Sequence, residues 1–170
     1  SGNDNIQHAN KEVKFRLSPK SSRSDPNAPA RTQIVIIDDN PANTELLKLT
    51  LREQLGYPNV KTFTNSLTAR DYILKHCLEI SYVILDIKMP RKNGLDLLSE
   101  LLPVMLCTRF ILCTALNRDD VIHEYRKITG KYPLAKVDLL FKPIDMTKLT
   151  ALLPPVKTKP ASPMRISTII

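Results

Sequence analysis

Between residues 33 and 153 the sequence alternates short apolar runs with longer segments whose apolar residues recur every three or four positions. The run Ile34–Ile37 is uninterrupted, consists of β-branched residues and is followed by acids, which is typical of a strand buried on both faces of a parallel sheet. Pro41 then suits a first helical turn, and Gly56 suits a helix stop. Leucines at four-residue spacing between them predict one amphipathic helix: Leu47, Leu51 and Leu55.

The same strand–helix unit repeats along the rest of this region. The remaining strands are predicted at 60–63, 82–85, 110–113 and 137–141, and the remaining helices at 66–76, 95–102, 119–128 and 146–153. Five such units predict an α/β fold, a doubly wound five-stranded parallel sheet with helices on both faces and flavodoxin-like strand order 2-1-3-4-5. Leucines of the first and last helices are assigned to the core: Leu46, Leu47, Leu51, Leu149, Leu152 and Leu153.

The ends of the chain lack this pattern. Residues 1–31 are rich in Ser, Asn, Pro and Lys, and we expect a disordered basic arm in which Ser1 and Gly2 fit a cloning remnant. Residues 32–153 are expected to form the domain, and 154–170 a disordered tail rich in Pro and Lys. Whether the chain stands alone or is a fragment stays open.

Net charge changes the picture only at the ends. The total is +8, but residues 1–31 carry six basic against three acidic side chains, residues 154–170 carry three against none, and the middle is close to neutral. Basic ends give at most weak, salt-dependent attraction to nucleic acid, and direct nucleic-acid binding is not expected otherwise. Without a membrane-spanning apolar run or a secretory signal, we expect a soluble, cytoplasmic protein.

Cysteine and histidine offer no metal or catalytic pattern. Cys77, Cys107 and Cys113 show no CxxC spacing and fall in apolar segments, so we expect buried free thiols. The three histidines, at positions 8, 76 and 123, are scattered without a partner at ligand spacing.

Chemically distinctive side chains follow the predicted strands. Asp38 and Asp39 follow the first strand, Asp86 the third, Thr114 the fourth and Lys142 the fifth. In open α/β sheets ligands bind outside the carboxyl ends of the strands, so these side chains should meet at one edge. Clustered carboxylates repel, and a hard cation with oxygen ligands, Mg²⁺, resolves the conflict. Asp86, on the central strand, is the natural nucleophile toward phosphorus.

Four segments carry a resemblance to a known family: VIIDDN (35–40), VILDIKMPRKNG (83–94), ILCTA (111–115) and FKPI (141–144). Over residues 33–153 the chain resembles the receiver domains of two-component response regulators, which are CheY-like. The resemblance implies that Asp86 is the phosphoacceptor, served by a sensor histidine kinase or a histidine phosphotransfer protein. It further implies that Mg²⁺ is bound by Asp38, Asp39, Asp86 and the backbone carbonyl of Lys88. Thr114 would be the switch hydroxyl, and Lys142, in a cis peptide with Pro143, would pair with the phosphoryl group. The resemblance also implies an output partner, which it does not identify.

The sequence departs from the family pattern in three places. Leu139 stands where the family usually has an aromatic switch residue, so we expect activation to be signalled through residues 115–136 instead. The segment 128–136 is longer than the usual loop before the fifth strand. Lys88 and Leu116 offer no group that orients water beside the acyl phosphate, which predicts slow self-dephosphorylation.

Three other functions fit parts of the pattern. An aspartate-nucleophile phosphohydrolase would need a second acid two residues after Asp86, where this chain has Lys88. A nucleic-acid-binding module would depend on the basic ends. A receiver-like scaffold that works without phosphorylation is the third, and the intact set of Asp39, Asp86, Thr114 and Lys142 speaks against it.

Overall fold

A computed structural model describes residues 32–156, so the predicted arm at 1–31 and the tail from residue 157 onward lie outside the described residues. The domain is built on a five-stranded parallel sheet of order β2-β1-β3-β4-β5. This order confirms the prediction from the sequence. The strands are β1 Gln33–Ile37, β2 Asn59–Phe63, β3 Ile80–Asp86, β4 Arg109–Thr114 and β5 Lys136–Phe141.

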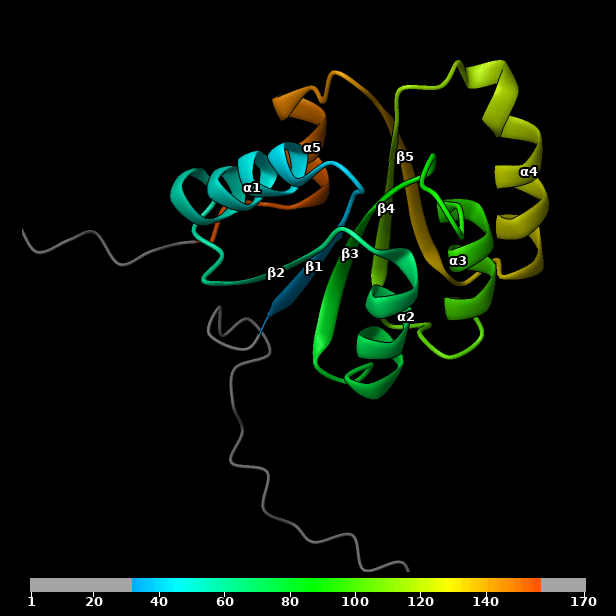
Figure 1. Cartoon of the computed structure of the whole chain (residues 1–170), viewed down its shortest axis with the longest axis horizontal. Helices are drawn as coiled ribbons and strands as arrows, with labels where there is room; N and C mark the ends of the chain where they lie inside the picture. The colour runs from blue at the N-terminus through cyan, green and yellow to red at the C-terminus, as the bar shows by residue number, and fades with distance from the viewer. Residues whose placement is uncertain (1–31, 157–170) are drawn as a thin grey trace, which may run out of the picture.

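Helices cover both faces of the sheet (Figure 1), as the sequence predicted. Helix α1 and α5 pack on one face, together with a π-helical turn, η2, that continues α1; α2, α3 and α4 pack on the other. Their bounds are α1 Pro41–Leu49, η2 Thr50–Gln54, α2 Ser66–Lys75, α3 Gly94–Leu101, α4 Arg118–Lys131 and α5 Met146–Leu152. No helix within residues 32–156 has the length and apolar character needed to cross a membrane.

The alternation of side chains along β1 explains the two-sided core. All five residues of β1 are buried. Ile34 and Ile36 belong to the apolar cluster beneath α1 and α5, whereas Val35 and Ile37 belong to the cluster beneath α2, α3 and α4. Because successive strand residues point to opposite faces, a continuous apolar run is what a strand covered on both sides requires.

Side-chain caps set where the helices begin after the strands. Asn40 accepts from the Ala42 amide at 3.0 Å, at the start of α1. Asn65, Asn93 and Asp145 cap α2, α3 and α5 in the same way. A cap oxygen satisfies amides that have no partner inside the helix. These caps hold the loops at the carboxyl edge of the sheet.

The structure corrects the assignment of Leu46 to the core. The Leu46 side chain is 68% exposed, whereas Leu51 and Leu149 are fully buried. Neighbouring residues on a helix lie about 100° apart, and α1 is oriented so that Leu46 points away from the sheet. Leu47 is the one that packs against the core.

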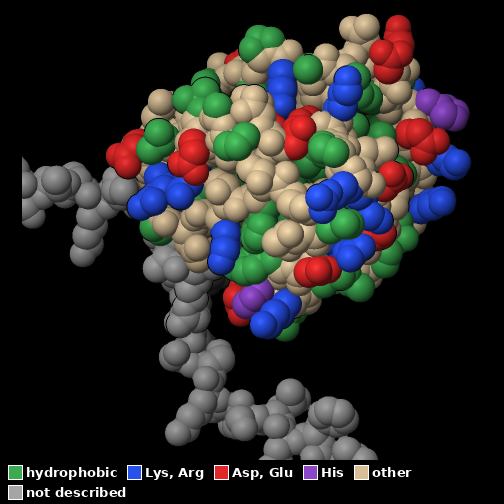
Figure 2. All heavy atoms as spheres, viewed as in Figure 1, with side chains coloured by type: hydrophobic (Ala, Val, Ile, Leu, Met, Phe, Trp, Pro, Cys, Tyr) green, Lys and Arg blue, Asp and Glu red, His purple; other side chains and the backbone are tan. Residues whose placement is uncertain are grey.

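Two further expectations are wrong. Helix α4 continues to Lys131, so only residues 132–135 connect it to β5, and the expected long loop over 128–136 is half helical. Cys107 is exposed and Cys77 is partly exposed, so only Cys113 fits the expectation of a buried thiol. Figure 2 shows acidic and basic side chains interspersed over the face drawn there, in keeping with the near-neutral charge of the middle of the chain.

Candidate functional site

Three carboxylates meet at the carboxyl edge of the sheet. Asp38 and Asp39 directly follow β1, and Asp86 ends β3, which is hydrogen-bonded to β1 with Ile37 opposite Leu85. One oxygen from each carboxylate can be chosen so that all three lie within 4.8 Å of one another. Asp38 and Asp86 are buried and Asp39 is exposed. The neighbouring strands therefore bring together the acids that the sequence placed at strand ends.

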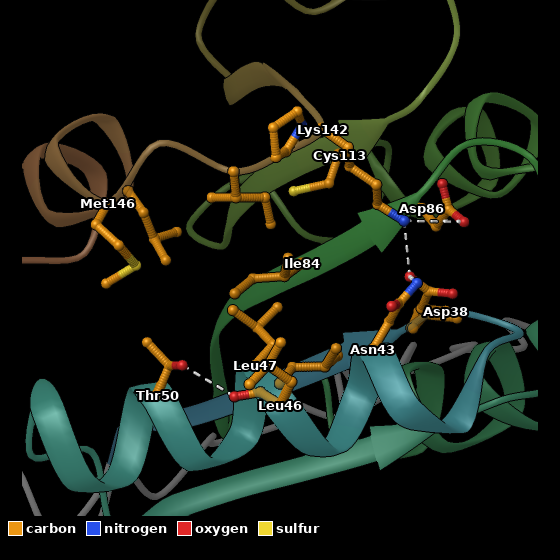
Figure 3. Close-up of a pocket in the computed structure, with 15 residues that line it drawn as sticks. Asp38, Asn43, Leu46, Leu47, Thr50, Ile84, Asp86, Cys113, Lys142 and Met146 are labelled. Atoms are coloured by element: carbon orange, nitrogen blue, oxygen red, sulfur yellow. Dashed lines mark hydrogen bonds and ion pairs between the residues drawn. The ribbon is translucent and has the colours of Figure 1, made fainter.

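Lys142 faces this cluster from the end of β5 (Figure 3). Its Nζ lies 2.9 Å from Oδ2 of Asp38 and 3.5 Å from Oδ2 of Asp86. Its backbone amide donates to the Thr114 carbonyl at 2.7 Å, which ties the residue to the end of β4. The Lys142–Pro143 peptide is cis, as the family resemblance implied.

Burial and charge oppose each other at this edge. Burial raises the pKa of Asp86 above its ordinary value, the Lys142 charge partly offsets this, and the charges of Asp38 and Asp39 add to it. Burial alone would lower the pKa of Lys142. The hydrogen bond to Asp38, together with the charges of Asp86 and Asp38, outweighs burial and raises that pKa. Lys142 therefore stays protonated, and the charged form of Asp86 is disfavoured relative to that of an exposed aspartate.

Asp38 is oriented by groups that sequence reasoning missed. The Asn40 amide donates to its Oδ1 at 2.9 Å, and Asn43 Nδ2 donates to its Oδ2 at 3.2 Å. Asn43 lies in the first turn of α1, close to the end of β1. In the sequence, the only indication of this contact was a polar residue five positions after Asp38.

Thr114 ends β4 and is fully buried. Its Oγ1 accepts from the Leu116 amide at 3.1 Å, so the hydroxyl keeps its own proton free to donate elsewhere. In the register of β3 with β4, Asp86 lies opposite Cys113, the residue before Thr114. The Lys88 side chain is exposed, and the role expected of its backbone carbonyl stays a prediction.

Gly94 supports the site through its lack of a side chain. Its amide donates to the Ile87 carbonyl at 2.7 Å, which brings the start of α3 against the backbone at the end of β3. A Cβ at this position would lie 2.3 Å from the Asp86 carbonyl oxygen and 2.9 Å from Ile87 Cα. In the sequence, Gly94 stands out only as the last residue of the segment 83–94 that carries the family resemblance.

The donor set fits a magnesium ion. All three nearby side chains offer carboxylate oxygens, the ligands that this hard cation prefers. Two of the carboxylates are buried, and Lys142 is the cation that pairs with both, so a divalent ion would relieve their remaining repulsion. The residues that would hold it are Asp38, Asp39 and Asp86.

Comparison with known proteins agrees with this geometry. A sequence model of the response regulator receiver domain matches residues 34–154. The transcriptional regulatory protein MalR of Bacillus subtilis is 32% identical over 127 residues, which are 74% of this chain and 50% of MalR. The chain spans about half the length of this and similar curated relatives.

Solved receiver structures share the fold. A response regulator receiver domain protein from Clostridium thermocellum has 25% identity and a TM-score of 0.61, covering 72% of this chain and 90% of that one. A response regulator receiver protein from Pseudomonas putida has 27% identity and a TM-score of 0.60, covering 72% and 95%. The matched region covers all of the described strands and helices except the first residue of β1, and the chain belongs to the response regulator receiver domain family.

Proposed function

We propose that this receiver domain accepts a phosphoryl group on Asp86, in a Mg²⁺-dependent reaction, from a histidine kinase or a histidine phosphotransfer protein. The observation that carries the proposal is the convergence on Asp86 of two carboxylates and one ammonium group. Lys142 Nζ lies 3.5 Å from Asp86 Oδ2, and oxygens of Asp38 and Asp39 lie within 4.8 Å. We also place the reaction in the cytoplasm, where such phosphodonors act.

In this reaction an Asp86 oxygen forms a bond to phosphorus while the bond from phosphorus to the donor nitrogen breaks. A Mg²⁺ ion held by Asp38, Asp39, Asp86 and the Lys88 carbonyl would neutralise charge on the phosphoryl oxygens. Asn43 and the Asn40 amide hold Asp38 in place from the other side. Asp86 is buried, which restricts the directions from which a phosphodonor can approach its carboxylate.

Lys142 and Thr114 would serve the product. The Lys142 ammonium is shared between Asp38 and Asp86, and it pairs with a phosphoryl oxygen once that group is on Asp86. The Thr114 hydroxyl, whose oxygen already accepts from Leu116, donates its proton to another oxygen.

The conformational response follows from what Thr114 is attached to. Its oxygen is bonded to the Leu116 amide, and Leu116 packs on the same apolar cluster as Tyr125 and Leu139. The Tyr125 hydroxyl donates to the Val137 carbonyl at 2.9 Å, which links α4 to β5. Movement of Thr114 toward a phosphoryl group would therefore shift the segment 115–136 without an aromatic residue at position 139.

The test is the intact mass of the protein after incubation with Mg²⁺ and acetyl phosphate. We expect the gain of one phosphoryl group, and no gain with Asp86→Asn or when Mg²⁺ is chelated. Asp96→Asn is the matched control, since Asp96 is an exposed aspartate on α3. A folded wild-type protein that binds Mg²⁺ yet gains no mass, from acetyl phosphate or from a phosphorylated phosphotransfer protein, would favour a phosphorylation-independent scaffold.

A further inference from the structure

An apolar groove runs from the phosphoacceptor edge between α1 and α5 (Figure 3). It encloses about 450 Å³. Asp38, Asp86 and Lys142 form its polar end, and Ile84 and Cys113 contribute to its apolar floor. This volume and this lining, mainly apolar with a few polar groups at one end, are typical of a binding groove.

The two rims of the groove expose large apolar side chains. Leu46, on α1, is 68% exposed, and Met146, on α5, is 40% exposed. Both line the groove from opposite helices. Apolar side chains that face each other across an open groove in this way indicate a surface that another segment covers.

The chain itself leaves the domain on this same side. The Val156 amide donates to the Leu55 carbonyl at 2.8 Å, and the Tyr57 hydroxyl donates to the Pro154 carbonyl at 2.5 Å. Pro154 and Val156 therefore contact the domain. Val156 packs on the apolar cluster that also includes Leu47, a residue of the groove wall. Residues 157–170 thus begin beside the far end of the helix that forms one rim.

The length of the following segment suits the groove. Leu46 precedes Leu55 by nine residues of helix, a rise of about 14 Å. Residues 157–163, when extended, span up to about 25 Å. Residues 164–170 are thereby able to reach the groove from the position of Val156.

The composition of the segment also suits it. Four apolar side chains lie near its end, namely Met164, Ile166, Ile169 and Ile170. Its charged residues are all basic: Lys157, Lys159 and Arg165. At the polar end of the groove the carboxylates of Asp38 and Asp86 share the single ammonium of Lys142, and the Asp39 carboxylate lies nearby, so a basic segment is attracted there.

We propose that residues 164–170 of the same chain occupy the groove between α1 and α5, with their apolar side chains between Leu46 and Met146 and their basic charge toward the carboxylates. The docking itself does not depend on the proposed phosphorylation, because it needs only the groove and the segment.

Hydrogen exchange of the full chain, measured by mass spectrometry without Mg²⁺ or phosphodonor, tests the docking. We expect amides of 164–170 to exchange on the order of tenfold more slowly than in the isolated peptide. Leu46→Ser, and separately Ile166→Ser with Ile169→Ser, should return them to the peptide rate. Leu78→Ser is the matched control: Leu78 is 99% exposed, lies between α2 and β3 and does not line the groove.

Each outcome decides the question. Exchange of residues 164–170 at the peptide rate in the wild type would overturn the proposal, as would equal loss of protection in Leu46→Ser and Leu78→Ser. Protection that disappears on dilution, with a matching change in molecular mass by light scattering, would assign the groove to a second copy instead. Protection that is independent of concentration and lost only in the groove and segment variants supports docking within one chain, whether or not Asp86 proves to be phosphorylated.

Discussion

Gly94→Ala should destabilise the domain although alanine is the better helix former. Gly94 is the first residue of α3, and its φ is not in the left-handed region, so the backbone itself would accept alanine. The added Cβ, however, would lie 2.3 Å from the Asp86 carbonyl oxygen and 2.9 Å from Ile87 Cα. Both neighbours are backbone atoms, so no side-chain rotation can relieve the overlap.

The sizes of the two effects give the expected sign. Replacing glycine by alanine in a helix gains about 0.5–1 kcal/mol, whereas overpacking costs about 1–3 kcal/mol and reaches the upper end when backbone must move. A net loss of about 2 kcal/mol reduces the folding equilibrium constant roughly thirtyfold. Because the displaced atoms belong to Asp86 and Ile87, phosphorylation of Asp86 should also slow.

Gly130→Ala is the internal control. Gly130 lies near the end of α4, and a Cβ built there meets nothing within 4 Å. This variant should gain about 0.5 kcal/mol from helix propensity alone. Urea unfolding of both variants and the wild type measures the two changes in the free energy of unfolding, provided that the dependence of this free energy on urea concentration is the same in all three proteins. If Gly94→Ala were as stable as Gly130→Ala, the proposed packing of α3 against the Asp86 backbone would be refuted.

Three more predictions concern the site. Lys142→Ala leaves two buried carboxylates without their cation, so the free energy of unfolding, measured by urea unfolding, should fall by about 3 kcal/mol. Added Mg²⁺ should restore part of this loss, and no recovery would contradict the metal site. The raised pKa of Asp86 means that its charged form is disfavoured in the fold, so stability declines as pH rises from 3.8 through the raised value. Asp86→Asn should thus exceed the wild type in stability at about pH 7 and lose that advantage below pH 3.8; a pH-independent difference would count against this. The double variant Lys88→Asn, Leu116→Glu should shorten the lifetime of the phosphoryl group on Asp86, which is measured as the loss of the added mass with time. An unchanged lifetime would show that these two side chains do not control dephosphorylation.

The local sequence was sufficient to predict the strands and the side chains that meet at the edge of the sheet. An apolar run such as Ile34–Ile37 is stable only where both faces of a strand are covered, so it indicates a central position in a parallel sheet. Asp38, Asp86 and Lys142 directly follow such runs. Parallel strands end at a common edge, so the sequence alone predicts that these three side chains meet there.

The tertiary structure decided what depends on the packing of one element against another. The amide of Asn43 reaches Asp38 because α1 packs over the end of β1, and a side chain at position 94 is unfavourable because α3 begins against the Asp86 backbone. The apolar spacing of α1 allowed Leu46 or Leu47 to face the core, and only the position of the helix over the sheet left Leu46 exposed beside Met146. Strand identity follows from side chains close in sequence, whereas the groove and these supporting contacts depend on how far α1, α3 and α5 lie from the sheet and from each other.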